Sequence, residues 1–84
     1  MEEQIEFENN EIADNLIAQL PDDSIFVSIS DFKGRKYVDI RKYFVSDNNK
    51  WIPTKKGIAL GKEQFERLLK ALNDNKDEII EALK

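Results

Sequence analysis

The middle of the chain alternates apolar and polar residues in short runs, a pattern that predicts β-strands. Residues 25–32 are rich in β-branched and aromatic side chains separated by serines, as expected for a half-buried strand. Lys33-Gly34 supplies a tight turn, and residues 36–45 alternate as a second strand. These two runs therefore predict a β-hairpin.

Two shorter strands are predicted after the next turn, which covers the polar residues 46–49. Residues 50–52 form the third strand. Pro53 ends this strand or lies on an edge, because proline has no amide hydrogen to donate. Residues 56–60 form the fourth strand, so the sheet is predicted to be four-stranded and antiparallel.

From Lys62 onward the apolar residues recur at helical spacing. The stripe consists of Phe65, Leu68, Leu69, Leu72, Ile79, Ile80 and Leu83. One continuous helix keeps this stripe on one face, whereas a break at residues 73–75 would give two helices, and both arrangements stay open. An antiparallel sheet followed by a C-terminal helix is an α+β fold.

The first 23 residues have a less regular pattern. Residues 5–8 alternate like a short strand, while the apolar positions of residues 12–20 fall at helical spacing. We favour a short helix near residues 11–20, closed by a turn that begins at Pro21. The chain is therefore divided into an acidic N-terminal segment, residues 1–23, and a sheet-plus-helix domain, residues 24–84.

Charge is distributed unevenly along the chain, whose net charge is -4. Residues 1–31 hold nine acidic and no basic side chains, residues 32–57 hold eight basic and two acidic ones, and residues 58–84 hold five basic and six acidic ones. The excess of +6 in residues 32–57 favours binding of a negatively charged phosphate backbone, although the net charge of the whole chain is negative. The acidic segment could compete for this patch, although we favour a solvated arm.

Several classes of site are excluded by composition. The chain has no Cys and no His, so zinc sites, thiolate chemistry and His-based triads are absent. No calcium-loop or phosphate-loop spacing occurs, and we expect no metal, no cofactor and no enzymatic activity. The acidic N-terminus and the lack of a long apolar run predict an intracellular protein with no membrane partner, in the cytoplasm or nucleoid of a bacterium or phage or in a eukaryotic nucleus.

Aromatic and basic residues are interleaved between residues 32 and 57. The aromatics are Phe32, Tyr37, Tyr43, Phe44 and Trp51, and the basic residues are Lys33, Arg35, Lys36, Arg41, Lys42, Lys50, Lys55 and Lys56. Basic side chains follow a phosphate backbone while aromatic faces stack unpaired bases, so this pattern predicts single-stranded DNA binding, with RNA not distinguished.

A purely structural interpretation is also open, because strand aromatics are usually core residues and strand lysines often protect edges. Phe26 and Tyr43 are candidates for the core. Phe32 and Phe44, each at a strand end beside charges, are candidates for stacking platforms, and Trp51 stays undecided.

Three motifs resemble a known family. They are Asp-Phe-Lys-Gly at residues 31–34, Val-Asp-Ile-Arg-Lys-Tyr-Phe at residues 38–44, and Lys-Gly-Ile-Ala-Leu at residues 56–60 before a helix. Together they resemble the single-stranded DNA-binding domain of the transcriptional coactivator positive cofactor four, over residues 24–72 without a gap.

The resemblance implies a homodimer in which each subunit has a curved four-stranded antiparallel β-sheet followed by a C-terminal helix. The subunits would meet through their helices, and the sheets would line channels for single strands. It assigns base stacking to Phe32 and Phe44, although relatives carry Trp at the position of Phe44. It places basic positions at Lys33 and Arg35, a phosphate contact at Arg41, and a basic turn at Lys56 and Gly57. The neighbouring Lys55 is added to the predicted nucleic-acid-binding residues because it belongs to the same basic run. Relatives carry basic residues where this chain has Ile25, Ser30 and Ile52, so we expect a less basic groove and weaker or more salt-sensitive binding.

Two further expectations concern partners. A chain of 84 residues buries a small core, and one helix stripe cannot cover a sheet and its edges, so a homodimer through the C-terminal helix is expected. The alternative function is a protein-interaction module that docks a transcription or replication protein and binds little nucleic acid.

Overall fold

The computed structural model describes residues 5–22 and 24–84, so residues 1–4 and 23 of the predicted acidic segment lie outside the described residues. Its centre is the antiparallel hairpin of β3 (Ile25–Phe32) and β4 (Arg35–Val45). Lys33 and Gly34 have φ values of 54° and 81°. Two positive φ angles in a two-residue loop are typical of the type I′ turn, whose twist matches that of the strands, and the predicted hairpin is confirmed.

Strand β5 (Lys50–Leu60) is one strand where the sequence predicted two. Pro53 pairs with Tyr43, and Gly57 pairs with Arg41. β5 advances four residues between these pairs while β4 advances two, so a β-bulge accommodates the extra residues of β5. Of the two alternatives for Pro53, the end of a strand is wrong, because β5 runs through it beside a bulge. The edge position is confirmed, since β1 pairs with β5 only at Lys50 and Trp51 in the described residues.

The N-terminal segment contributes two strands to the sheet. β1 (Glu6–Phe7) pairs in parallel with β5, and β2 (Leu16–Gln19) pairs antiparallel with β3. The strand order β1-β5-β4-β3-β2 gives a five-stranded mixed sheet, so the predicted four-stranded antiparallel sheet is wrong in its strand number and in one pairing. The alternation of residues 5–8 did mark a short strand.

Helix α1 (Asn10–Asp14) is shorter than the predicted helix at residues 11–20. Asn9 caps it by accepting a hydrogen bond from the Glu11 amide at 2.9 Å. Beyond Asn15 the chain pairs with the free edge of β3, and this pairing outweighs the helical spacing because it satisfies backbone groups on both strands. The helix prediction is therefore wrong for residues 16–20.

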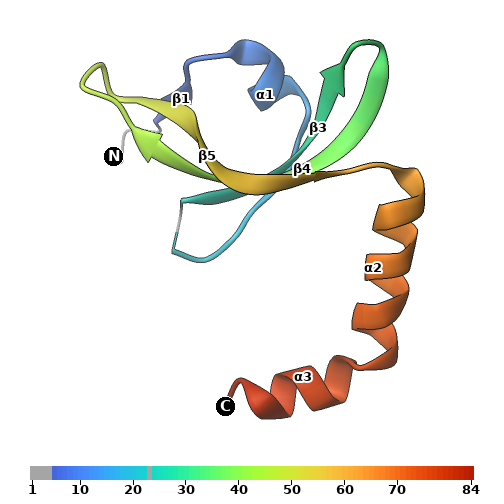
Figure 1. Cartoon of the computed structure of the whole chain (residues 1–84). Coiled ribbons are helices and arrows are strands. Elements are labelled where there is room, and N and C mark those ends of the chain that lie inside the picture. Colours follow the sequence, from blue (N-terminus) through green and yellow to red (C-terminus); the bar gives the residue numbers. More distant parts are fainter. Residues whose placement is uncertain (1–4, 23) are drawn as a thin grey trace.

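Two helices follow the sheet, α2 (Lys62–Asp74) and α3 (Lys76–Ala82). They are separated by Asn75, whose side-chain amide donates to the Ala71 carbonyl at 2.8 Å. This bond gives the carbonyl a partner where the helix ends. The two-helix alternative is confirmed, and Figure 1 shows α2 leaving the end of β5 and α3 turning sharply away from it.

The aromatic part of the core lies on the inner side of the curled sheet, the side on which Figure 1 shows α1. Phe26 and Tyr43 are each 2 % exposed, which confirms both core predictions. Phe7 of β1 packs edge-on against them, with ring centroids 4.9 Å from Phe26 and 5.7 Å from Tyr43. Trp51 is half-buried and packs edge-on against Phe26 at 5.2 Å, so it belongs to the same aromatic cluster.

Candidate nucleic-acid interface

The tip of the β3–β4 hairpin presents one aromatic ring and two cationic side chains. Phe32 is 62 % exposed and pairs in register with Arg35. The ammonium group of Lys33 lies 5.3 Å from the centre of the Phe32 ring, within cation–π range. An unpaired base can therefore stack on a ring that already has positive charge beside it.

A second group of predicted residues lies at the bulge of β5. The backbone carbonyl of Thr54 accepts a hydrogen bond from Arg41 at 2.9 Å, and its hydroxyl donates to the Lys42 carbonyl at 2.7 Å. The same hydroxyl accepts from the Lys56 amide at 3.1 Å. These bonds fix the bulge, and both Lys55 and Lys56 project from it as exposed side chains.

Arg41 lies on the inner face and is held by groups of its own chain. Its Nε lies 3.1 Å and 3.2 Å from the two carboxylate oxygens of Asp39, and its Nη2 lies 3.0 Å from one of them. The side chain is 22 % exposed. Most of its donors are therefore occupied within the protein, which leaves a narrow part of the guanidinium for a phosphate.

Gly57 explains how Arg41 can lie so close to β5. A Cβ built on Gly57 would lie 2.8 Å from the Cβ and Cγ of Arg41. Any larger residue would push the two strands apart at this register position. The contribution of Gly57 in this structure is thus a steric one, exerted on the neighbouring arginine.

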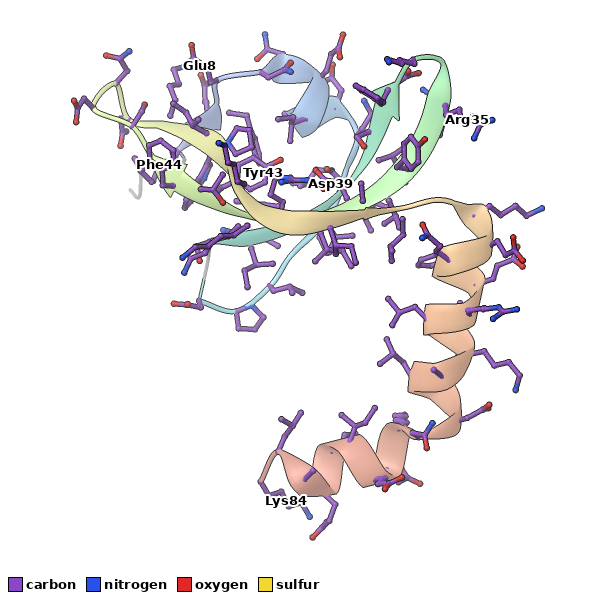
Figure 2. The ribbon with its side chains drawn as sticks, in the orientation of Figure 1. Glu8, Arg35, Asp39, Tyr43, Phe44 and Lys84 are labelled. Atoms are coloured by element: carbon purple, nitrogen blue, oxygen red, sulfur yellow. The ribbon has the colours of Figure 1, made fainter. Side chains whose placement is uncertain are left out.

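Phe44 stands apart from the other predicted residues. It is 50 % exposed and pairs with Ile52 near the far end of β4. Nine residues separate it from Arg35 on the same strand, or about 30 Å at roughly 3.3 Å per residue. Figure 2 shows Phe44 and Arg35 at opposite ends of the sheet. The predicted residues thus form three groups spread along β4, a layout suited to a chain-like ligand.

A groove of about 700 Å³ lies between α1 and the inner face of the sheet. Its charged lining side chains are Glu11, Asp31, Lys36, Asp39 and Arg41, and its uncharged polar ones include Asn9, Asn15, Ser28 and Ser30. Three carboxylates face two cations here. Ser30 is part of this lining. The expectation of a less basic groove than in relatives stays a prediction.

Tyr43 closes the floor of this groove as a neutral group. Burial raises the pKa of its phenol, and the nearby carboxylate of Asp39 raises this pKa further. A hydrogen bond with the buried Ser28 and the charge of Arg41 act in the opposite direction. Figure 2 shows Tyr43 and Asp39 on the inner side of the sheet, so Tyr43 serves the floor and the aromatic cluster.

The groove contains residues that sequence reasoning did not assign to a site. Asn9, Glu11 and Asn15 reach it from α1 and its flanks, and Phe7 anchors the segment below them. The interpretation of this segment as a solvated arm is wrong for residues 5–20, which pair with or lie on the sheet. The signal in the sequence was Phe7, an aromatic ring set between two glutamates.

Residues 5–22 and 24–84 contain neither a metal-binding cluster nor a membrane-spanning helix. No cluster of three or more Asp, Glu, His or Cys side chains there has a geometry that could hold a metal ion. In that same part of the chain no helix combines the length and the apolar character needed to cross a membrane.

Comparison with known proteins finds a matching family, a similar sequence and two similar structures. The family profile described as transcriptional coactivator p15 (PC4) matches residues 20–71. A candidate RNA polymerase II transcriptional coactivator of Caenorhabditis elegans is 43 % identical over 44 residues, which is 51 % of this chain and 36 % of that protein. The chain thus spans about a third of this relative's length.

Two solved structures have a similar fold, and both contain MoSub1 with DNA. The crystal structure of a MoSub1–DNA complex matches with a TM-score of 0.69 and 30 % identity, covering 84 % of this chain and 90 % of that one. A MoSub1 complex with single-stranded DNA in phosphate buffer matches with the same TM-score and identity, covering 84 % of each chain. The curled sheet and C-terminal helices are therefore shared with proteins crystallised on DNA.

Proposed function

The chain belongs to the family of the transcriptional coactivator p15 (PC4), and we propose on that premise that it binds single-stranded DNA along β4 in transcription regulation. The observation that carries the proposal is the exposed Phe32 ring with Lys33 above it and Arg35 beside it. The MoSub1 complexes with DNA support the same ligand. This is a binding function, and no catalytic group enters it.

Each group of residues has a distinct part in the proposed complex. Phe32 and Phe44 stack bases near the two ends of β4, since every base offers a π-face. The exposed side chains of Lys33, Arg35, Lys55 and Lys56 contact phosphates between them. Arg41, held by Asp39, offers its remaining donors from the inner face, and Gly57 keeps the room for it.

A titration tests this proposal directly. A labelled oligothymidine of about 20 nucleotides is added to the protein at salt concentrations from about 50 to about 200 mM. Four phosphate contacts predict that log K falls with log salt at a slope of about -3, because each contact to a single strand contributes about -0.7. Absence of binding at the lowest salt would contradict the proposal. The same titration with oligouridine separates a DNA from an RNA preference.

We also propose that the protein acts as a homodimer through its C-terminal helices. The stripe residues Phe65, Leu68, Leu69, Leu72, Ile80 and Leu83 are all exposed in the single chain. An apolar hollow of about 380 Å³ on the outer face of the sheet, lined by residues such as Ile17, Val27, Val38 and Phe65, continues this surface. Exposed apolar surface of this kind marks an interaction site, and a second copy covers it symmetrically.

Light scattering tests the dimer. The expected mass is twice 9.8 kDa at micromolar concentration. Leu72→Glu places a charge in the stripe and is expected to shift the mass to that of the monomer, because an unpaired charge is costly in an apolar interface. A monomeric mass for the unchanged chain would contradict the proposal.

A second candidate function is docking of a transcription or replication protein. Either function would be carried out within the cell and, for a eukaryotic source, in the nucleus. The naming of the Caenorhabditis elegans relative as a candidate coactivator favours it. Both roles are compatible, since DNA lies along β4 while another protein can use a different surface. Binding of a partner protein without any binding of the oligothymidine would make docking the main function.

A further inference from the structure

The N-terminal segment of residues 5–15 occupies the inner face of the sheet, next to the groove. Its β1 residue Phe7 packs in the aromatic cluster at 4.9 Å from Phe26. The Glu8 amide donates to the Trp51 carbonyl at 3.1 Å, and the Asn15 carbonyl accepts from the Ile29 amide at 3.0 Å. Between these two attachments lies α1, which Figure 1 shows above the inner side of the sheet. Residues of α1 and its flanks line the groove together with Arg41.

Like a nucleic acid, this segment is negatively charged. Residues 5–15 contain four carboxylates, those of Glu6, Glu8, Glu11 and Asp14, and no basic side chain. Glu6 forms an ion pair of 3.0 Å with Lys50 of β5. Glu11 faces the groove that Arg41 lines. A phosphate backbone that entered this groove would meet like charge at close range, which is unfavourable.

The order of the side chains in this segment also resembles the order of groups along a single-stranded nucleic acid. In Glu6-Phe7-Glu8 an aromatic ring stands between two carboxylates, as a base stands between two phosphates along a single strand. The ring of Phe7 already lies against Phe26 and Tyr43, and a cation of β5 already neutralises one carboxylate. The segment thus contacts aromatic rings and a cationic side chain of the sheet, as a bound single strand would contact such groups.

The attachment of the segment is shallow, so it can be displaced. β1 has two residues and α1 has five. Only Ile5, Phe7 and Ile12 of residues 5–15 are half-buried, and the others are exposed. Segments with few buried apolar contacts open at a small fraction of the global unfolding free energy.

From this geometry we infer that residues 5–15 are a built-in competitor of the single strand, which must leave the inner face before DNA can occupy the groove. The inference rests on the proposed function. In this inference the segment controls the affinity for DNA. The apparent dissociation constant is inversely proportional to the fraction of molecules in the open form, in which residues 5–15 have left the inner face.

Two variants and one measurement on the unchanged chain test this inference. Deletion of residues 2–14 removes the competitor and leaves the Asn15 carbonyl in place. The triple variant Glu6→Gln, Glu8→Gln, Glu11→Gln keeps the apolar contacts and removes three charges. Both are expected to bind oligothymidine about tenfold more tightly, the factor for an open form that is about a tenth of the molecules.

The matched control changes three carboxylates of α3, through Asp77→Asn, Glu78→Gln and Glu81→Gln. It alters the net charge equally but far from the groove, so it separates local competition from overall charge. The triple Gln variant decides the matter if the deletion variant does not fold. In the unchanged chain, hydrogen exchange of the Glu8 amide is expected to become faster when oligothymidine binds, because the segment is released.

The outcomes are distinguishable. Tighter binding by the groove variants but not by the α3 control supports the competitor. Equal or weaker binding by them, or slower exchange of the Glu8 amide on binding, overturns it and makes the segment a neutral cover or a wall of the DNA site. If neither the full chain nor any variant binds oligothymidine, the proposed function itself fails.

Discussion

Replacement of Gly57 by alanine tests how the inner face of the sheet is built. The new Cβ would lie 2.8 Å from the Cβ and Cγ of Arg41 and 2.9 Å from its Cα. Carbon atoms prefer separations of about 3.5 to 4.0 Å. Two of the three opposing atoms move only with the backbone, so β4 and β5 must separate beside the bulge.

The cost can be worked from these contacts. Overpacking by a single methyl group typically costs about 1 to 3 kcal/mol. Separation of the strands also strains the bond from Arg41 to the Thr54 carbonyl, and such a bond contributes about 0.5 to 1.5 kcal/mol. We expect a loss of about 2 to 3 kcal/mol, which for a domain of this size lowers the Tm by roughly 10 to 20 °C.

Urea unfolding followed by the fluorescence of Trp51 measures this loss, with both proteins at the same protomer concentration because a dimer couples stability to concentration. Gly61→Ala is the matched control. Its new Cβ has no atom nearer than 4.0 Å, the Cε1 of Tyr37, and it changes only the helix N-cap, at a cost below about 1 kcal/mol. Equal stability of the two variants would refute the steric role of Gly57.

Three further predictions concern the site. Phe32→Ala and Phe44→Ala are each expected to weaken oligothymidine binding by about 1 to 3 kcal/mol without lowering the Tm, since both rings are exposed and a stacked base contributes that much. The double change of Lys55 and Lys56 to Ala should flatten the salt slope by about 1.4, the contribution of two phosphate contacts. Tyr43→Phe should remove a loss of stability at alkaline pH, measured as the urea midpoint from about pH 8 to 11.

The sign of the pH effect follows from the raised pKa of Tyr43. The unfolded phenol ionises near its ordinary pKa of 10.0, while the folded one stays neutral to higher pH. The stabilisation is thus complete below pH 10 and is lost as the pH rises through the folded pKa. A Tyr43→Phe variant that keeps the full alkaline slope would assign that slope to other groups.

The stacking prediction has an internal control in Phe26→Ala. This ring is buried, so its removal should destabilise the fold by about 3 to 5 kcal/mol. Unfolding of the Phe32 or Phe44 variants to a similar degree would show that those rings are structural.

Local features of the sequence determined a large part of the fold. The hairpin was readable because a type I′ turn needs positive φ angles, which Lys33-Gly34 supplies between two alternating runs. The helical stripe after Lys62 could also be predicted, because its apolar residues recur with the local period of a helix. Burial of Phe26 and Tyr43, and exposure of Phe32 and Phe44, also followed from position along each strand.

Features that depend on contacts between distant residues were decided by the tertiary structure. Residues 16–19 have helical spacing, yet they form β2 because the edge of β3 offers backbone partners. β5 runs through Pro53 because a bulge, between the positions that pair with Arg41 and Tyr43, accommodates the extra residues. No local pattern carries this information, since each choice depends on which strand lies alongside.

The candidate site divides in the same way. The sequence by itself determined which residues are aromatic or basic and that they share β3, β4 and β5. Only the tertiary structure decided that Arg41 is held by Asp39 and that the acidic residues 5–15 lie over the inner face. The physical reason is that electrostatic and steric interactions depend on the distance between groups in the folded chain. The sequence gives only the order of the residues, so it does not show which distant residues come within a few ångströms of each other.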